Sequence, residues 1–151
     1  MPTIREAGIE FAEAIAAVLE RSLDPPWNAS SVASFLSVPG SFAFLTAPDD
    51  AAPEGVILCR AAADSCDLAA IGVVCEARRK GLGTALLAAA QGEAAARHCR
   101  HMFLEVAETN QAAIGLYLSQ GFREVAKRVA YYRAGGRSAP PVDAIVMRRD
   151  F

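Results

Sequence analysis

Near the start of the chain, apolar residues recur at the spacing of a helix that buries one face. These positions are Ile9, Ala12, Ile15, Ala16 and Leu19. A short strand is expected over residues 3–6 before them, and Asn28, a residue type that commonly caps helices, precedes a second helical segment over 29–36. The pattern predicts one strand followed by two helices.

The next part of the chain consists of short runs rich in β-branched and aromatic residues. Runs over 42–46, 56–60 and 67–74 are separated by polar turns, which predicts three consecutive antiparallel strands. The period then changes to that of a helix, from Gly81 to about Arg97.

The remaining segments predict an alternation of strands and helices. A buried strand over 102–106 precedes a helix over 111–120 that Gly121 ends, and strands follow over 124–133 and 143–149. The predicted fold class is α/β (α+β), with a single mixed, mostly antiparallel central sheet of about six to seven strands flanked by helices on both faces. A ligand is expected where the strand directions change.

Composition supports one soluble globular domain over residues 1–151. The chain is 53% hydrophobic and 21% charged, which excludes a disordered protein. A net charge of −2 gives no general basis for binding nucleic acid, and no apolar stretch is long enough to span a membrane. We expect a cytoplasmic monomer or weak homodimer with no membrane association.

The cysteines do not predict a metal site or a disulfide framework. Cys59, Cys66, Cys75 and Cys99 are too widely spaced for paired ligands, so reduced, mostly buried thiols are expected. His98, Cys99 and His101 have no second ligand pair nearby, which favours a solvated helix end over a metal cluster. No metal is predicted.

The segment over 71–84 runs from an apolar strand through a basic, glycine-containing turn into a helix. Free backbone N–H groups, the positive end of the helix dipole and three cations at 78–80 favour a phosphate or pyrophosphate there. An ordinary strand-to-helix turn with a solvated basic run remains the alternative. Leu86 excludes a dinucleotide fingerprint, and Lys80 precedes Gly81, which excludes a P-loop.

Two motifs in this chain resemble those of the GNAT superfamily of N-acetyltransferases. Arg78-Arg79-Lys80-Gly81-Leu82-Gly83 is similar to its R/Q-x-x-G-x-G/A signature, and residues 104–122 are similar to its L-E-V-x-x-x-N-x-x-A-x-x-L-Y-x-x-x-G-F block. The resemblance covers about residues 3 to 149 and implies the GNAT fold. The Tyr131-Tyr132 pair with residues 143–147, and Pro26-Trp27, resemble more narrowly the RimI-type ribosomal-protein-alanine N-acetyltransferases.

The resemblance implies roles for individual residues. Acetyl-CoA would be the co-substrate, held along its pantetheine arm by Ile71, Gly72 and Val73 and at its pyrophosphate by Arg78, Arg79, Lys80, Gly81, Leu82, Gly83 and Thr84. Asn110 is implied as a further cofactor contact. Glu105 is implied as the general base and Tyr117 as the general acid, and Tyr131 and Tyr132 are implied to line the peptide entrance.

Each implied role has a structural alternative. Strand alternation alone turns Glu105 to solvent, Tyr117 could pack in the core with Ile114 and Leu118, and Asn110 could cap the helix that follows it. The expected function is transfer of acetyl from acetyl-CoA to a protein N-terminal α-amino group, the N-terminal alanine of a small-subunit ribosomal protein. The alternatives are a small-molecule amine as acceptor and a non-catalytic acyl-CoA-binding module.

Overall fold

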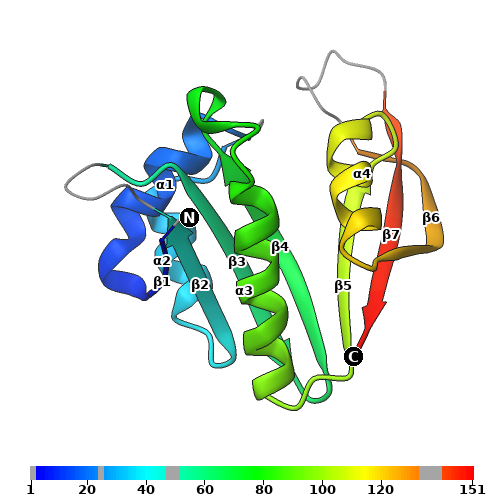
Figure 1. The fold of residues 1–151 in the computed structure, drawn as a ribbon, viewed down its shortest axis with the longest axis horizontal. Coiled ribbons are helices and arrows are strands. Elements are labelled where there is room, and N and C mark those ends of the chain that lie inside the picture. The colour runs from blue at the N-terminus through cyan, green and yellow to red at the C-terminus, as the bar shows by residue number, and fades with distance from the viewer. Residues whose placement is uncertain (1–2, 24–25, 47–51, 133–140) are drawn as a thin grey trace.

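A computed structural model describes residues 3–23, 26–46, 52–132 and 141–151, with the side chains of 130–132 excepted. Seven strands form one mixed sheet in the order β1-β2-β3-β4-β5-β7-β6, which confirms the predicted fold class (Figure 1). The strands are β1 (Ile4–Ala7), β2 (Ser41–Thr46), β3 (Gly55–Ala62), β4 (Ser65–Val73), β5 (His101–Ala107), β6 (Arg123–Tyr132) and β7 (Val142–Asp150).

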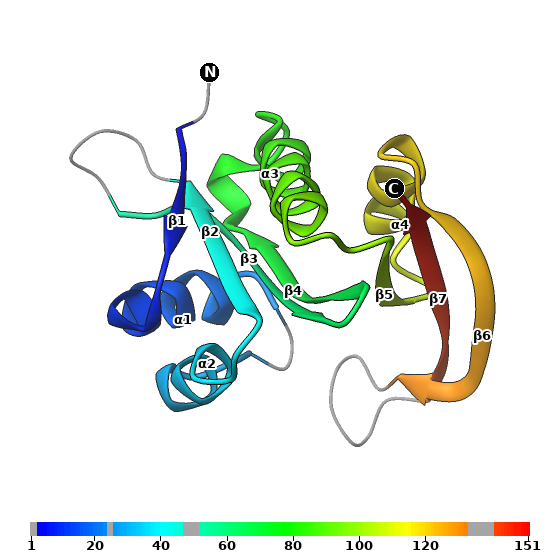
Figure 2. The same ribbon diagram turned by 90° about the horizontal axis from the view of Figure 1, so that it is seen from below.

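Helices cover both faces of the sheet. Helices α1 (Ala12–Glu20) and α2 (Ala29–Leu36) lie on one face, and α3 (Leu82–Ala96) and α4 (Gln111–Ser119) lie on the other (Figure 2). Two apolar cores result, one beneath α1 and α2 and the other beneath α3 and α4. None of the helices in these ranges is long and apolar enough to cross a lipid bilayer.

The sheet opens between its two central strands. β4 and β5 run parallel and pair only at Ser65 with His101, Cys66 with Met102, and Asp67 with Phe103. Beyond these three pairs the strands diverge, as Figure 1 shows, and each strand leaves an edge of backbone N–H and C=O groups that its neighbour does not bond. The opening is therefore a place where an extended ligand can hydrogen-bond to the sheet.

β7 completes the half of the sheet that contains β5. It pairs antiparallel with β5 from Ala107–Ala144 to His101–Asp150 and with β6 on its other side. The His101 ring bonds Asp150 Oδ1 at 2.8 Å, and this bond, with nearby arginines, lowers the pKa of the Asp150 carboxyl. Because it pairs with both strands, β7 joins β5 to the edge strand β6.

The element boundaries agree closely with the predicted pattern, with one local difference at the first helix. Residues Ile9–Phe11 form a 3₁₀ turn, closed by a bond from Phe11 N–H to Gly8 O, and the α-helix begins only at Ala12. Ile9, predicted on the buried face, is consequently 51% exposed. The predicted cap is confirmed, because Asn28 Oδ1 accepts a hydrogen bond from Ser31 N–H.

Candidate active site

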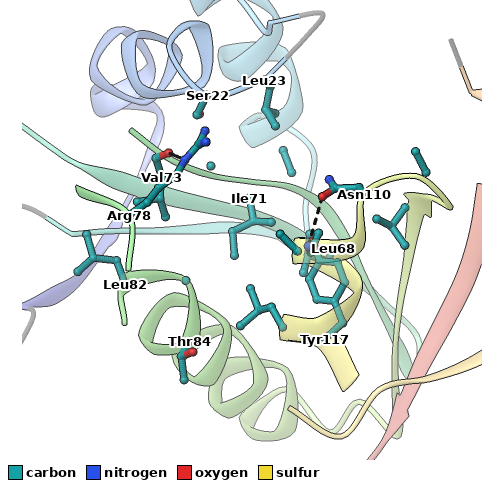
Figure 3. A pocket seen from close by; sticks show the side chains of 18 of the residues that line it. Ser22, Leu23, Leu68, Ile71, Val73, Arg78, Leu82, Thr84, Asn110 and Tyr117 are labelled. Carbon is teal, nitrogen blue, oxygen red and sulfur yellow. Dashed lines mark hydrogen bonds between the residues drawn. The ribbon is translucent and has the colours of Figure 1, made fainter. Parts of the chain in front are cut away.

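A cleft of about 820 Å³ occupies the opening between β4 and β5 (Figure 3). It brings together most of the predicted site residues, namely Ile71, Gly72, Val73, Arg78, Arg79, Gly81, Leu82, Gly83, Thr84, Glu105, Asn110 and Tyr117. Lys80 is exposed and is not among the lining residues. The side chains of Tyr131 and Tyr132 lie outside the described residues, although their backbone belongs to β6.

On the β4 side of the cleft, the backbone N–H groups of every second residue point into the cleft. Val74 N–H donates to Glu54 O at 2.9 Å, so Val74 turns its amide toward β3. In a strand that pairs antiparallel, the hydrogen-bonding direction alternates, so the N–H groups of Ile71 and Val73 point to the cleft. The N–H group of Gly72 points to β3 and not to the cleft. Glycine at this position allows close packing of the strand against the end of α1, since a Cβ there would overlap the hydroxyl of Ser22.

The turn that follows β4 is shaped to leave backbone amides free. Gly81 has φ +79° and caps α3, and Arg79 also has a positive φ, +67°. The first helical bond runs from Ala85 N–H to Gly81 O at 3.0 Å. The helix itself therefore supplies no acceptor for the N–H groups of residues 82–84.

Charge reinforces these amides. The helix dipole adds a partial positive charge at the start of α3, and Arg78 and Arg79 line the same end of the cleft. Arg78 Nε donates to Val73 O at 3.1 Å, which ties its guanidinium to the end of β4. An anion is favoured at this end of the cleft.

Glu105 lies on β5 at the opening, with its side chain 32% exposed. Its neighbours Leu104 and Val106 are buried in the core under α3 and α4, so alternation turns Glu105 to the other face of the sheet. The predicted solvent-facing position is confirmed, and the same position lines the cleft. Arg128 Nη2 of β6 lies 3.3 Å from Glu105 Oε1, an ion pair that no local pattern predicted.

Tyr117 of α4 and Asn110, which caps α4, line the cleft on the opposite face from Glu105. Tyr117 is buried, and its ring packs against Phe122 at 5.8 Å between centroids, whereas Leu118, predicted as a packing neighbour, is 54% exposed. Asn110 Oδ1 accepts from Ala113 N–H at 3.2 Å, which confirms the predicted cap (Figure 3). A carboxylate and a phenol therefore approach the opening from its two sides.

Several lining residues were absent from the sequence-based site. Ser22 and Leu23 reach the cleft from the segment just after α1, more than 75 residues before β5 in the chain. Other lining positions carry small side chains that leave the cleft wide, namely Ala69, Ala70, Ala77, Ala107, Ala112 and Ala113. Alanine is common throughout this chain, so nothing in the pattern distinguishes these alanines from others.

The donor set of the cleft fits a long ligand with amides in its middle and phosphates at one end. The free edge of β4 can pair with amides, and the turn before α3 can hold a pyrophosphate through backbone N–H groups. In the ranges that the structure describes, no group of three or more His, Cys, Asp or Glu side chains is arranged to hold a metal ion.

Comparison with known proteins gives a consistent result. The model of the acetyltransferase (GNAT) family matches residues 12–122. Over 49 residues the chain is 47% identical to N-alpha-acetyltransferase RimI of Mycobacterium tuberculosis, a match that spans 32% of this chain and 28% of that protein.

Two solved structures resemble the whole chain. The ribosomal-protein-S18-alanine N-acetyltransferase from Escherichia coli superposes with a TM-score of 0.89 at 29% identity, covering 99% of this chain and 94% of that one. The NatC complex bound to Gag peptide and CoA gives a TM-score of 0.85 at 18% identity, covering 99% and 98%. The latter likeness is evidence for the fold alone.

Proposed function

This chain belongs to the GNAT family of acetyltransferases and is an acetyl-CoA-dependent N-acetyltransferase, and we propose that it acetylates the α-amino group of a protein N-terminus. The proposed acceptor is the N-terminal alanine of a small-subunit ribosomal protein. This choice is supported by the likeness to the Escherichia coli enzyme, which carries that substrate in its name and spans nearly the whole chain.

The observation that carries the proposal is the placement of Glu105 and Tyr117 on opposite faces of the opening in the sheet. The α4 face contributes a buried phenol, while the other face offers a partly exposed carboxylate. An acceptor that enters from the Glu105 face can meet an acyl donor lying between β4 and β5. We propose that acetyl is transferred directly from donor to acceptor, without a covalent enzyme intermediate.

Glu105 acts as the general base in this proposal. An α-amine has a pKa of about 7.7–8.0, so a fraction of it is neutral at neutral pH, and the neutral nitrogen must still lose a proton once it bonds to the thioester carbon. Among the described residues that line the cleft, Glu105 is the one carboxylate. It accepts a proton from the amine, directly or through a water, as the nitrogen bonds to the carbonyl carbon of the thioester.

Tyr117 acts as the general acid. When the carbon–sulfur bond breaks, the departing thiolate needs a proton, and the phenolic O–H of Tyr117 can donate one. The backbone of Ile71 and Val73 is proposed to bind the pantetheine arm of acetyl-CoA. Residues 78–84 are proposed to hold its pyrophosphate, with Asn110 contacting the co-substrate from α4.

The test is a transfer assay with isotopically labelled acetyl-CoA. The purified protein is incubated with unacetylated small-subunit ribosomal proteins and with a panel of small amines, and the label is located by mass spectrometry. We expect label on one N-terminal alanine. In Glu105→Gln and Tyr117→Phe we expect kcat to fall by about 100-fold, the lower end of what a general base or acid contributes.

Glu108→Gln is the matched control for the base. Glu108 follows β5 closely, pairs with Lys127 at 3.4 Å and does not line the cleft, so its loss should leave turnover near that of the wild type. Label only on small amines would refute the protein acceptor. Near-normal turnover in Glu105→Gln would refute the assignment of the base.

A further inference from the structure

The guanidinium of Arg128 lies beside the proposed base. Arg128 Nη2 is 3.3 Å from Glu105 Oε1, although β7 separates β5 from β6. The register explains the reach, since Glu105 pairs with Val146 and Arg128 pairs with Ala144, two residues along β7. The long arginine side chain crosses β7 to the carboxylate. The base is consequently one half of an ion pair.

This ion pair changes the charge that an acceptor meets. An unpaired carboxylate would attract any ammonium ion, whereas Glu105 with Arg128 carries a net charge near zero. The neighbouring cation Lys127 pairs with a different carboxylate, Glu108, at 3.4 Å. In the described part of the cleft the remaining charged residues are Arg78 and Arg79, which are cations as well.

We propose that Arg128 is a specificity-determining residue that lowers the affinity of ammonium ions for the acceptor position beside Glu105. The inference rests on the proposed function, because it concerns the amine that this site accepts. An amine hydrogen-bonded to Glu105 lies within two hydrogen-bond lengths, about 6 Å, of the Arg128 guanidinium. Like charges repel at that distance, whereas a neutral amine is unaffected.

This lowered affinity for cations selects among amines by their charge. At pH 7 roughly one α-amine in ten is neutral, whereas only about one lysine side chain in 2,500 is neutral. Arg128 therefore disfavours occupation of the site by almost every lysine side chain, while the neutral α-amine, the form that attacks, binds without that penalty. On a partner protein that presents many lysines, Arg128 keeps the site from being blocked.

The test measures cation binding separately from catalysis. Two unreactive analogues of one acceptor peptide are prepared, in which the terminal amine is replaced by a trimethylammonium group or by a tert-butyl group of the same shape. Their dissociation constants are measured by calorimetry on the CoA-bound protein at low ionic strength. The ratio of the two constants reports the effect of the positive charge alone.

In Arg128→Gln we expect the cationic analogue to bind about fivefold more tightly relative to the neutral one, because a like charge near 6 Å has been removed. Added salt should shrink this change. Arg128→Lys keeps the charge and should retain the wild-type ratio. Lys127→Gln removes the adjacent cation that does not pair with Glu105, so its ratio should also remain that of the wild type.

Two results would overturn the inference while leaving the proposed acceptor intact. One is an unchanged ratio in Arg128→Gln, and the other is an equal change in Lys127→Gln, which would indicate a general surface field. The proposed function fails in a different way, through the absence of acetyl transfer to any peptide N-terminus by the wild type. In that case the role of Arg128 in acceptor selection fails with it.

Discussion

At the scale of the residue, Gly81 shows how one backbone conformation prepares the cleft. Its φ of +79° belongs to the left-handed region, and a Cβ built there would have no heavy atom within 4 Å. The reason for glycine is therefore conformational and not steric. An L residue can occupy this position only at a cost in backbone energy. If the backbone changed to avoid that cost, the first amides of α3 would point in another direction.

We predict that Gly81→Ala lowers the free energy of unfolding by about 1 kcal/mol and weakens CoA binding. Gly92→Ala is the matched control, because Gly92 lies within the same helix with equal space around it, and alanine should stabilise the helix there. Urea unfolding and CoA titration of both variants provide the measurement. Equal stabilisation by the two alanines would contradict the conformational explanation.

Residues whose surroundings are local in sequence could be predicted, and residues paired across the sheet could not. The turn at Gly81, the cap at Asn110 and the exposed side of Glu105 each follow from a few neighbouring residues. Arg128 could not be assigned to Glu105, because their contact depends on the register of β7 between them. A pattern of apolar positions contains no information about that register.

At the scale of the element, the approach of α1 to β4 depends on Gly72. A Cβ there would overlap Ser22 Oγ and lie 3.3 Å from Leu19 Cδ2. Ser22 Oγ is in turn held by its bond to Val18 O at 2.6 Å. The end of α1, which lines the cleft, is positioned by this contact with the strand.

We predict that Gly72→Ala destabilises the protein by about 2 kcal/mol, within the usual range for overpacking. Ser22→Ala in the same chain should recover part of this loss, since it removes the hydroxyl that the new methyl group meets. A double-mutant cycle by urea unfolding measures the coupling between the two positions. Purely additive effects would show that α1 does not approach β4 through this pair.

Strand order, like the pairing of single residues across the sheet, could not be predicted from local sequence patterns. The predicted strands and helices match those observed within a few residues, because each depends on its own apolar period. The position of β7 between β5 and β6, and the divergence of β4 from β5, arise from pairing between distant segments. The sequence predicted a ligand where the strand directions change but not how that opening is formed.

At the scale of the whole molecule, the sheet has two halves that share only three residue pairs between β4 and β5. A ligand in the cleft touches both halves, since the lining residues come from β4, α3, β5 and α4. Binding should therefore stabilise the molecule as a unit. At a CoA concentration of 100 times Kd, the expected gain in unfolding free energy is about 2.7 kcal/mol.

Hydrogen exchange on the free and CoA-bound protein tests this expectation. Amides of Ile71 and Val73 on one side of the cleft, and of Glu105 and Ala107 on the other, should gain protection together. Thermal unfolding should show one transition that moves to higher temperature with CoA. Protection confined to one half of the sheet would contradict a ligand that bridges the opening.

The place of β7 in the sheet also bears on how this protein acquires its activity during synthesis. β7 follows β5 and β6 in the chain, yet it is the strand that joins them, and the distance between Glu105 and Arg128 depends on it. Until the residues of β7 have emerged from the ribosome, the earlier segments lack the partner that sets their register. Strands β1 to β4 can pair before β7 is made, whereas the proposed selectivity for the acceptor can arise only after β7 has been translated and has paired.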